Sequence, residues 1–257
     1  MQDPLTDLPP PSRFLLDDLN NFASPDDSVR LPHPFIAWNR TLDIPPKLLL
    51  VALSKSACHL VHYLPTKKII GTFVLPEASM AGNTLLPSLQ DKSCCLLYAL
   101  EETENPTVVL ASVQYTVSAE RSNAWAKTLL REVRPEKVVV VGSIPSQHFR
   151  GKLSSDEALI FNLETLAQRL DEKDGALKGV PYFPSGSVVD GLAAALLTQC
   201  QIMKLKGRLL VSWPDYDDPV VNLLTSVLKK VCPAVDFSVS AKTPLLKALR
   251  VDSDLYT

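Results

Sequence analysis

A run of four valines closes the segment Lys137–Val141, directly after a segment with helical periodicity. In Ala119–Val133 the apolar side chains recur every three to four residues, which predicts an amphipathic helix with Ser118 as its N-cap. A valine run without polar alternation is typical of a strand that is covered on both faces. Because Thr107–Val113 is also rich in β-branched residues, the three segments predict a βαβ unit with parallel strands and a right-handed crossover.

Other short apolar runs, each bounded by polar turns, predict further buried strands. These runs are Leu48–Leu53, Cys58–Leu64, Lys68–Leu75, Cys94–Leu100 and Arg208–Trp213. The segment Glu157–Asn162 fits either a strand or the start of a helix. Two more helices are predicted for Ser187–Met203 and Asp218–Val231, and a short turn is predicted for Pro244–Leu249.

The alternation of strands and helices predicts an α/β fold, with a mixed, mostly parallel sheet between helical layers. We expect one domain over residues 47–250 and a flexible tail at 251–257. Residues 1–46 differ, because they hold nine of the 21 prolines of the chain. Proline lacks an amide donor and has a fixed φ, so this stretch is predicted to be an arm that packs on a domain edge or stays mobile.

The charge and the cysteines of the chain narrow the classes of function. The net charge is −2, from 26 basic and 28 acidic residues, without the basic surplus of a nucleic-acid-binding protein. No stretch approaches the ~20 apolar residues of a membrane span. The five cysteines include no C-x-x-C pair and lie mostly in apolar runs, which favours a reduced compartment. These features, and the lack of a signal-peptide pattern, predict a soluble cytoplasmic protein with access to the nucleus.

The scarce histidines do not predict a metal site. His59 and His62 lie three residues apart in the predicted strand Cys58–Leu64. Side chains at that spacing on a strand point to opposite faces, so the two imidazoles are not expected to share a metal ion. An acidic loop, residues 214–218, lacks the spacing and the glycine of a calcium loop, and Asp217 or Asp218 is expected to cap the next helix.

Two loops lie at positions in the predicted fold where α/β enzymes commonly bind ligands. Gly142-Ser143 follows the valine strand, and residues 184–187 precede a predicted helix whose first amides could hold an anion. Neither loop contains a nucleophile elbow, a dinucleotide fingerprint or a P-loop. A strand-to-loop turn explains Gly142-Ser143, and a helix N-cap explains Ser185 or Ser187. We therefore expect no cofactor and no catalytic residue, and an enzyme acting through these loops remains the alternative.

The chain ends in Leu255-Tyr256-Thr257, a hydrophobic residue, a tyrosine and any residue before the carboxylate. A leucine can fill an apolar pocket, and a tyrosine adds contact area and a hydroxyl at a low cost in side-chain entropy. Capture of a terminal carboxylate is an established mode of recognition. The three residues therefore predict a docking motif, although terminal residues are often only a frayed end.

The tail and one helix–strand pair together resemble the proteasome assembly chaperone family. The pair comprises Gly191–Gln201, with the sequence GLAAALLTQCQ, and Gly207–Trp213, with the sequence GRLLVSW. The tail is a hydrophobic–tyrosine–any (HbYX) motif of the kind that these chaperones share with proteasome activators. The similarity extends over roughly residues 47–257 and is strongest at 188–213 and 251–257. The proline-rich N-terminus departs from the family, so the resemblance implies nothing about residues 1–46.

The resemblance implies a fold related to nucleoside phosphorylases, a three-layer α/β/α arrangement, but no enzymatic activity. It also implies a heterodimer with a homologous chaperone, a proteasome assembly chaperone 2-like protein, on the outer face of the proteasome α-ring. Leu255, Tyr256 and the carboxylate of Thr257 would then enter a pocket between neighbouring α-subunits and meet a lysine there.

The small apolar segment Gly191–Leu197 indicates close packing on both sides, and we expect Gly191, Ala194 and Leu197 to contact the partner chaperone. Two alternatives remain. One is a phosphorylase-like or hydrolase-like enzyme with a ligand at 142–143 or 184–187. The other is a different protein that docks through its tail, such as a proteasome activator or adaptor.

Overall fold

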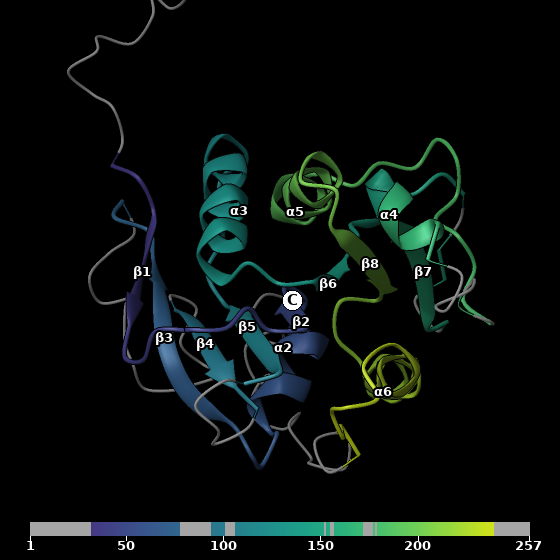
Figure 1. Ribbon diagram of the computed structural model, residues 1–257. Coiled ribbons are helices and arrows are strands. Elements are labelled where there is room, and N and C mark those ends of the chain that lie inside the picture. Colours follow the sequence, from purple (N-terminus) through teal and green to yellow (C-terminus); the bar gives the residue numbers. More distant parts are fainter. Residues whose placement is uncertain are drawn as a thin grey trace, which may run out of the picture. The chain divides into compact units, whose positions relative to one another are not determined.

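The computed structural model describes residues 32–77, 94–100, 106–151, 153–154, 157–171, 177 and 179–238. Within these residues the strands form one sheet in the order β1-β3-β4-β5-β2-β6-β8-β7 (Figure 1). Their bounds are β1 Phe35–Trp38, β2 Leu48–Ala52, β3 Lys68–Val74, β4 Cys95–Ala99, β5 Val108–Val113, β6 Lys137–Ser143, β7 Leu159–Glu164 and β8 Lys206–Trp213.

The centre of the sheet is parallel, and its two sides are antiparallel. Strands β5, β2, β6 and β8 run in one direction, whereas β4, β3 and β1 on one side and β7 on the other pair antiparallel. The predicted mixed sheet is thereby confirmed. The predicted β5–helix–β6 unit is also present with parallel strands, and β2 lies between the two strands of this unit.

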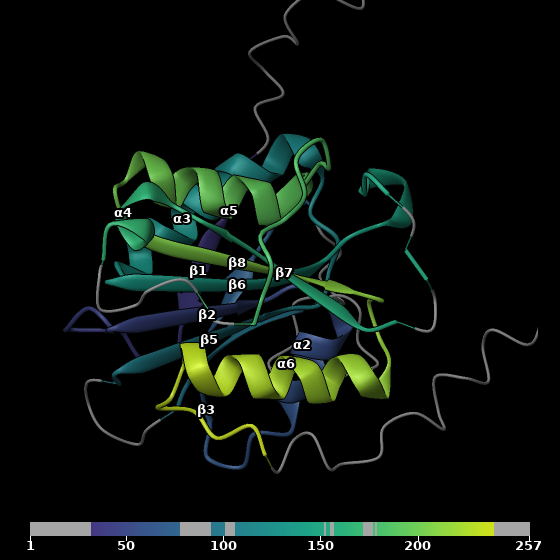
Figure 2. The ribbon, with the colours of Figure 1, turned by 90° about the vertical axis from the view of Figure 1, so that its right-hand side faces the viewer.

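Helices cover both faces of the sheet (Figure 2). Their bounds are α2 Lys55–His62, α3 Ala119–Val133, α4 Leu166–Arg169, α5 Gly191–Ile202 and α6 Asp218–Val231. Helices α3 and α5 pack on one face over a core that includes Trp125, and α2 and α6 pack on the other over a core that includes Phe237. The three-layer α/β/α arrangement is therefore confirmed. No helix among the described residues combines the length and apolar character of a membrane span.

The first correction concerns the predicted strand Cys58–Leu64, which the structure shows to be wrong. Residues 55–62 form helix α2, and the hydroxyl of Ser54 caps it by accepting a hydrogen bond from Ala57 N at 3.2 Å. The apolar residues of this stretch also match the i, i+3, i+4 pattern of a helix, and Leu60 and Val61 are buried against the sheet. A short apolar run of this length is compatible with a buried strand and with a buried helix, so its sequence does not distinguish the two.

His59 and His62 therefore do not point to opposite faces, as predicted for a strand. On a helix, residues three apart lie on neighbouring positions of one side. His59 is buried, and its ring lies 4.9 Å from that of Tyr63, centroid to centroid. Among the described residues, no three His, Cys, Asp or Glu side chains come together as metal ligands would.

The sheet begins earlier than the predicted domain boundary at residue 47. Strand β1 lies within the segment assigned to the arm and forms the edge of the sheet next to β3. Gly71 of β3 allows this close approach, because a Cβ there would lie 3.0 Å from the carbonyl oxygen of Ala37. The rest of the predicted arm before residue 32 and the predicted turn at 244–249 lie outside the described residues.

Candidate protein-binding surface

The HbYX tail, Leu255, Tyr256 and Thr257, lies outside the described residues. The description of the chain ends at Ser238, after helix α6. The assignment of these three residues to a docking motif therefore stays a prediction from the sequence.

Helix α5 carries the other predicted contact residues, Gly191, Ala194 and Leu197. The helix begins at Gly191, after Asp190 as its N-cap, and not at Ser187 as predicted. Its buried side, which includes Leu196, packs against α3 and the strands β6 and β8. Ala194 and Leu197 lie on the other side, where they are half-buried.

A pocket of about 230 Å³ opens beside Ala194 and Leu197, and we call it the first pocket. Gly191 does not belong to it, so the structure brings two of the three predicted contact residues together. The opposite wall comes from strand β7 and from the segment that follows α4. The lining residues are Leu163, Phe183, Ser187, Val189, Ala194, Leu197, Thr198 and Leu209.

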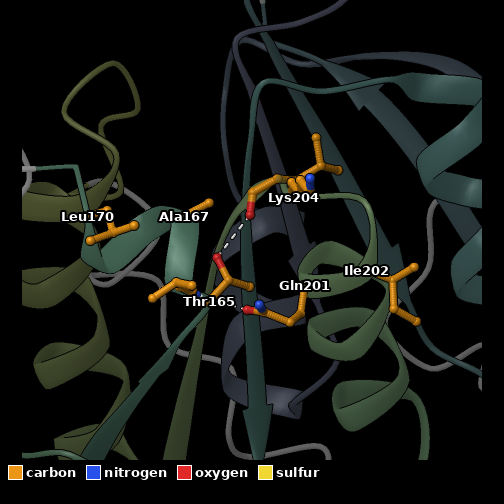
Figure 3. A pocket seen from close by; sticks show the side chains of 8 residues that line it. Thr165, Ala167, Leu170, Gln201, Ile202 and Lys204 are labelled. Atoms are coloured by element: carbon orange, nitrogen blue, oxygen red, sulfur yellow. Dashed lines mark hydrogen bonds between the residues drawn. The ribbon is translucent and has the colours of Figure 1, made fainter.

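A second pocket, of about 300 Å³, lies further along α5 (Figure 3). In Figure 3 its two walls are the short helix α4, with Ala167 and Leu170, and the end of α5, with Gln201 and Ile202. The full lining is Thr165, Leu166, Ala167, Leu170, Gln201, Ile202, Lys204 and Leu205. The first and second pockets together are called the α5 groove below.

Hydrogen bonds hold α4 against the end of α5. The hydroxyl of Thr165 donates to the carbonyl oxygen of Leu205 at 2.9 Å and accepts from Gly207 N at 3.0 Å. The same oxygen caps α4 by accepting from Gln168 N at 3.3 Å, and Gln201 Oε1 accepts from Leu166 N at 2.9 Å. The N-terminal end of α4 is therefore attached at several points to Gln201 of α5 and to the residues that follow α5, Leu205 and Gly207.

Lys204 ends α5 in a conformation that usually belongs to glycine. Its φ is +56°, and the amides of Lys204 and Leu205 donate to the carbonyl oxygens of Gln201 and Cys200. This is the Schellman arrangement, in which the left-handed residue is most often glycine. No described residue forms an ion pair with Lys204, although the neighbouring Lys206 pairs with Asp171 at 2.6 Å.

Large exposed apolar side chains gather near the α5 groove. Eight such side chains occur among the described residues, and six of them fall between residues 166 and 203. Leu170 is 70% exposed and Ile202 is 66% exposed, on the two walls of the second pocket. The other four are Leu166, Tyr182, Val188 and Met203. Large exposed apolar patches on a protein surface commonly mark sites of interaction with other molecules.

A buried ion pair supports the wall that β7 contributes. Glu164 Oε2 lies 3.4 Å from Arg208 Nη2 of the adjacent strand, and both side chains are 3% exposed. The hydroxyl of Tyr182 donates to Glu164 Oε1 at 2.7 Å, and this hydrogen bond to the carboxylate raises the pKa of Tyr182. Backbone hydrogen bonds between Asn162 and residues 181 and 183 fix the same segment along the edge of β7.

The two loops proposed for an enzyme have structural roles in the described fold. Ser187 Oγ accepts a hydrogen bond from Arg150 N at 2.8 Å, and neither Ser185 nor Ser187 caps α5. Ser143 lies exposed at the end of β6, and the neighbouring Gly142 carbonyl oxygen accepts from Ser212 Oγ at 3.1 Å.

The acidic loop 214–218 is also used within the fold. The predicted cap is confirmed, because Asp217 Oδ1 accepts from Asp218 N at the start of α6. Asp215 Oδ1 accepts from Lys55 N at 3.2 Å, at the N-terminus of α2. A carboxylate of the chain itself therefore occupies the helix end at which an external anion would bind.

Sequence reasoning missed helix α4 and the second pocket. One signal was available, because Thr165 and Gln168 have the spacing of a capping box ahead of a helix. The exposed Leu166 and Leu170 gave no such signal, since a leucine in a short segment is expected to be buried.

The comparisons with known proteins agree with the predicted resemblance. No family model matches the chain. A curated protein named proteasome assembly chaperone 1, from the sea anemone Nematostella vectensis, is 26% identical over 157 residues. The match covers 60% of this chain, and the chain spans only 60% of the length of that relative. The similarity to a proteasome assembly chaperone is thus confirmed.

Solved structures confirm the fold alone, because their sequence identities are low. Pyrococcus furiosus PbaA, described as an archaeal homolog of proteasome-assembly chaperone, has a TM-score of 0.58 at 15% identity, over 87% of this chain and 90% of its own. Pyrococcus furiosus PbaB, described as an archaeal proteasome activator, has a TM-score of 0.59 at 14% identity, over 87% and 97%.

Proposed function

We propose that this chain is a proteasome assembly chaperone that acts by binding, without chemistry of its own. The observation that carries the proposal is the 26% identity to a curated chaperone of that name. The fold supports it, since homologs of the same architecture are described as an assembly-chaperone homolog and as a proteasome activator. The described residues are consistent with it, because Ser187 Oγ accepts a hydrogen bond from Arg150 N and the Gly142 carbonyl oxygen accepts one from Ser212 Oγ within the fold.

In this proposal the chain forms a heterodimer with a proteasome assembly chaperone 2-like protein and binds the outer face of the proteasome α-ring. The exposed side of α5, with Ala194 and Leu197, contributes to the contact with the partner chaperone. The tail Leu255-Tyr256-Thr257 enters a pocket between α-subunits. The complex works in the cytoplasm and has access to the nucleus.

The free energies of tail binding indicate that two contacts are needed, one by the tail and one by the folded body. Ordering the tail costs about 1–2 kcal/mol per backbone residue. A charge-assisted hydrogen bond to the terminal carboxylate contributes about 1.5–3 kcal/mol, and burial of Leu255 contributes about 1.5–3 kcal/mol. The tail alone therefore binds weakly, and docking of the folded body is needed to raise its effective concentration.

A pull-down from cell extract with protein identification by mass spectrometry tests the proposal. We expect the intact chain to capture α-subunits and a homologous chaperone, and a chain without Leu255–Thr257 to lose mainly the α-subunits. One extra glycine after Thr257 should have nearly the same effect, because it displaces the carboxylate while keeping all three side chains. Thr257→Ala is the matched control and should bind normally. Failure of the intact chain to capture any proteasome subunit would refute the function.

A further inference from the structure

The two pockets of the α5 groove lie on one side of α5. Ala194, Leu197 and Thr198 border the first pocket, and Gln201, Ile202 and Leu205 border the second. Within α5 these positions form two rows with spacings of three or four residues, 194-197-201 and 194-198-202, which places them in one stripe along the helix, and Leu205 follows its C-terminal end. The facing wall is also continuous in sequence, from Leu163 at the end of β7 through α4 to Leu170. The two pockets therefore follow one another along α5.

The distance between the pockets suits a second helix. The α5 residues of the first pocket centre near position 196, and those of the second pocket and the following turn centre near position 203. Position 203 lies just past the end of α5 at Ile202, so at 1.5 Å per residue the helix itself accounts for about 9 Å of this separation. Two side chains at positions i and i+7 of another α-helix lie on one face about 10 Å apart, which is close to this separation. Each pocket has room for one large apolar side chain of such a helix.

The charges around the second pocket indicate which charge a bound helix should carry there. Lys204 borders this pocket and has no ion-pair partner among the described residues. The other cations nearby already face acids, since Arg169 lies 3.6 Å from Glu164 and Lys206 lies 2.6 Å from Asp171. An acidic side chain on the incoming helix would therefore meet Lys204, whereas a basic one would be repelled.

We propose that the α5 groove binds an amphipathic α-helix of a partner protein. This helix places large apolar side chains at i and i+7 in the two pockets, and an Asp or Glu within one turn of the second apolar residue, opposite Lys204. Helix-in-groove binding is a common mode of peptide recognition, with affinity supplied by such apolar anchors. The inference deepens the proposed partner contact of α5 and rests on the proposed function only for the identity of the partner.

A synthetic helix tests the groove on the purified full-length chain. The probe is a fluorescein-labelled, alanine-based 20-residue peptide with two leucines seven positions apart and a glutamate one turn after the second leucine. Its control has the same composition, but the leucines are five positions apart and therefore lie on different faces. Fluorescence anisotropy should show that the first peptide binds at least about tenfold more tightly than the control, because only one leucine of the control can be buried at a time.

Variants of the chain locate the binding site. Ile202→Glu should abolish binding of the peptide, and Ile44→Glu is the matched control, since Ile44 is also exposed but lies outside the groove. Lys204→Glu should weaken binding about fivefold or more and should prefer a peptide in which lysine replaces the glutamate. Equal binding of the two peptides, or unchanged binding by Ile202→Glu and Lys204→Glu, would overturn the proposal.

A second copy of the chain is the competing occupant of the groove. Analytical ultracentrifugation of the intact chain and of Ile202→Glu distinguishes this case. A dimer that dissociates in the variant would overturn the proposal, because the groove would then serve self-association. The peptide assay is independent of the tail, so a chain without Leu255–Thr257 should bind the peptide normally. Failure of the groove therefore leaves the result of the proteasome pull-down untouched.

Discussion

Replacement of Glu164 by glutamine should destabilise the protein strongly. Glu164 and Arg208 are each 3% exposed, and Glu164 Oε2 lies 3.4 Å from Arg208 Nη2. The amide of glutamine keeps the shape of the side chain but removes the charge that compensates the guanidinium. Breaking a buried pair in this way costs about 3–5 kcal/mol, since an uncompensated charge stays buried. A second loss is not expected at Tyr182, because the amide oxygen can still accept its hydrogen bond.

Two further variants separate the ion pair from general effects of substitution at this strand edge. Arg169→Gln is the matched control: Arg169 also faces Glu164, at 3.6 Å, but its side chain is 62% exposed. Because the Arg169 side chain is mostly in solvent and Glu164 keeps Arg208 as its partner, the loss should be about 0–1 kcal/mol. The double variant Glu164→Leu with Arg208→Met should recover most of the loss, because an apolar replacement of a buried pair is often neutral or stabilising.

Urea unfolding followed by tryptophan fluorescence provides the measurement, since Trp125 of α3 is fully buried in the core. The difference in unfolding free energy between each variant and the parent chain gives the three costs. A cost for Glu164→Gln no larger than that for Arg169→Gln would refute the reasoning. Such a result would mean that water reaches the Glu164–Arg208 pair, so that the pair is not buried in solution.

Three further predictions concern the core and the end of α5. Gly207→Ala should cost about 1–3 kcal/mol in urea unfolding through overpacking, because its Cβ would lie 2.8 Å from the Cβ of Cys200; Gly142→Ala, with the nearest atom at 3.7 Å, should cost less than about 1 kcal/mol. Lys204→Gly should raise the unfolding free energy by about 0.5–1 kcal/mol, because glycine adopts the positive φ without strain, and a loss of stability would contradict this. Burial raises the pKa of Cys58 from 9.0 to about 12, so the stability that its neutral thiol contributes is complete below pH 9 and is lost between pH 9 and 12. The unfolding free energy should therefore fall as the pH rises above 9, by about 1.4 kcal/mol per pH unit for this one group, and Cys58→Ala should show a shallower fall than the parent chain.

Periodic patterns predicted several elements well. Helices α3 and α6 have the predicted bounds, Ala119–Val133 and Asp218–Val231, because each has a single apolar stripe and a polar side. The valine strand is also present as β6, since an unbroken β-branched run suits a strand covered on both faces. In these segments the pattern of the residues and their tertiary environment agree.

Other segments carried a pattern that fits more than one structure. The apolar run at 58–64 satisfies the spacing of a strand and of a helix, and one hydrogen bond at the N-terminus of helix α2 comes from Asp215, 160 residues away in the chain. Helix α5 is apolar nearly all round, so its sequence does not indicate which side faces the sheet. The neighbours α3, β6 and β8 decide that, and they leave Ala194 and Leu197 on the groove side.

The α/β class and most of the strands and helices could be predicted from the residues alone, because periodicity is a local property of the chain, and the HbYX tail stays a prediction of the same kind. Only the tertiary structure decided the order of the strands, the antiparallel sides of the sheet and the α5 groove. The groove combines side chains from β7, α4 and the end of α5, and Gly207 lets these elements approach closely. Such contacts depend on which distant segments pack together, and the free energy of that packing is set by the whole core rather than by any one stretch of residues.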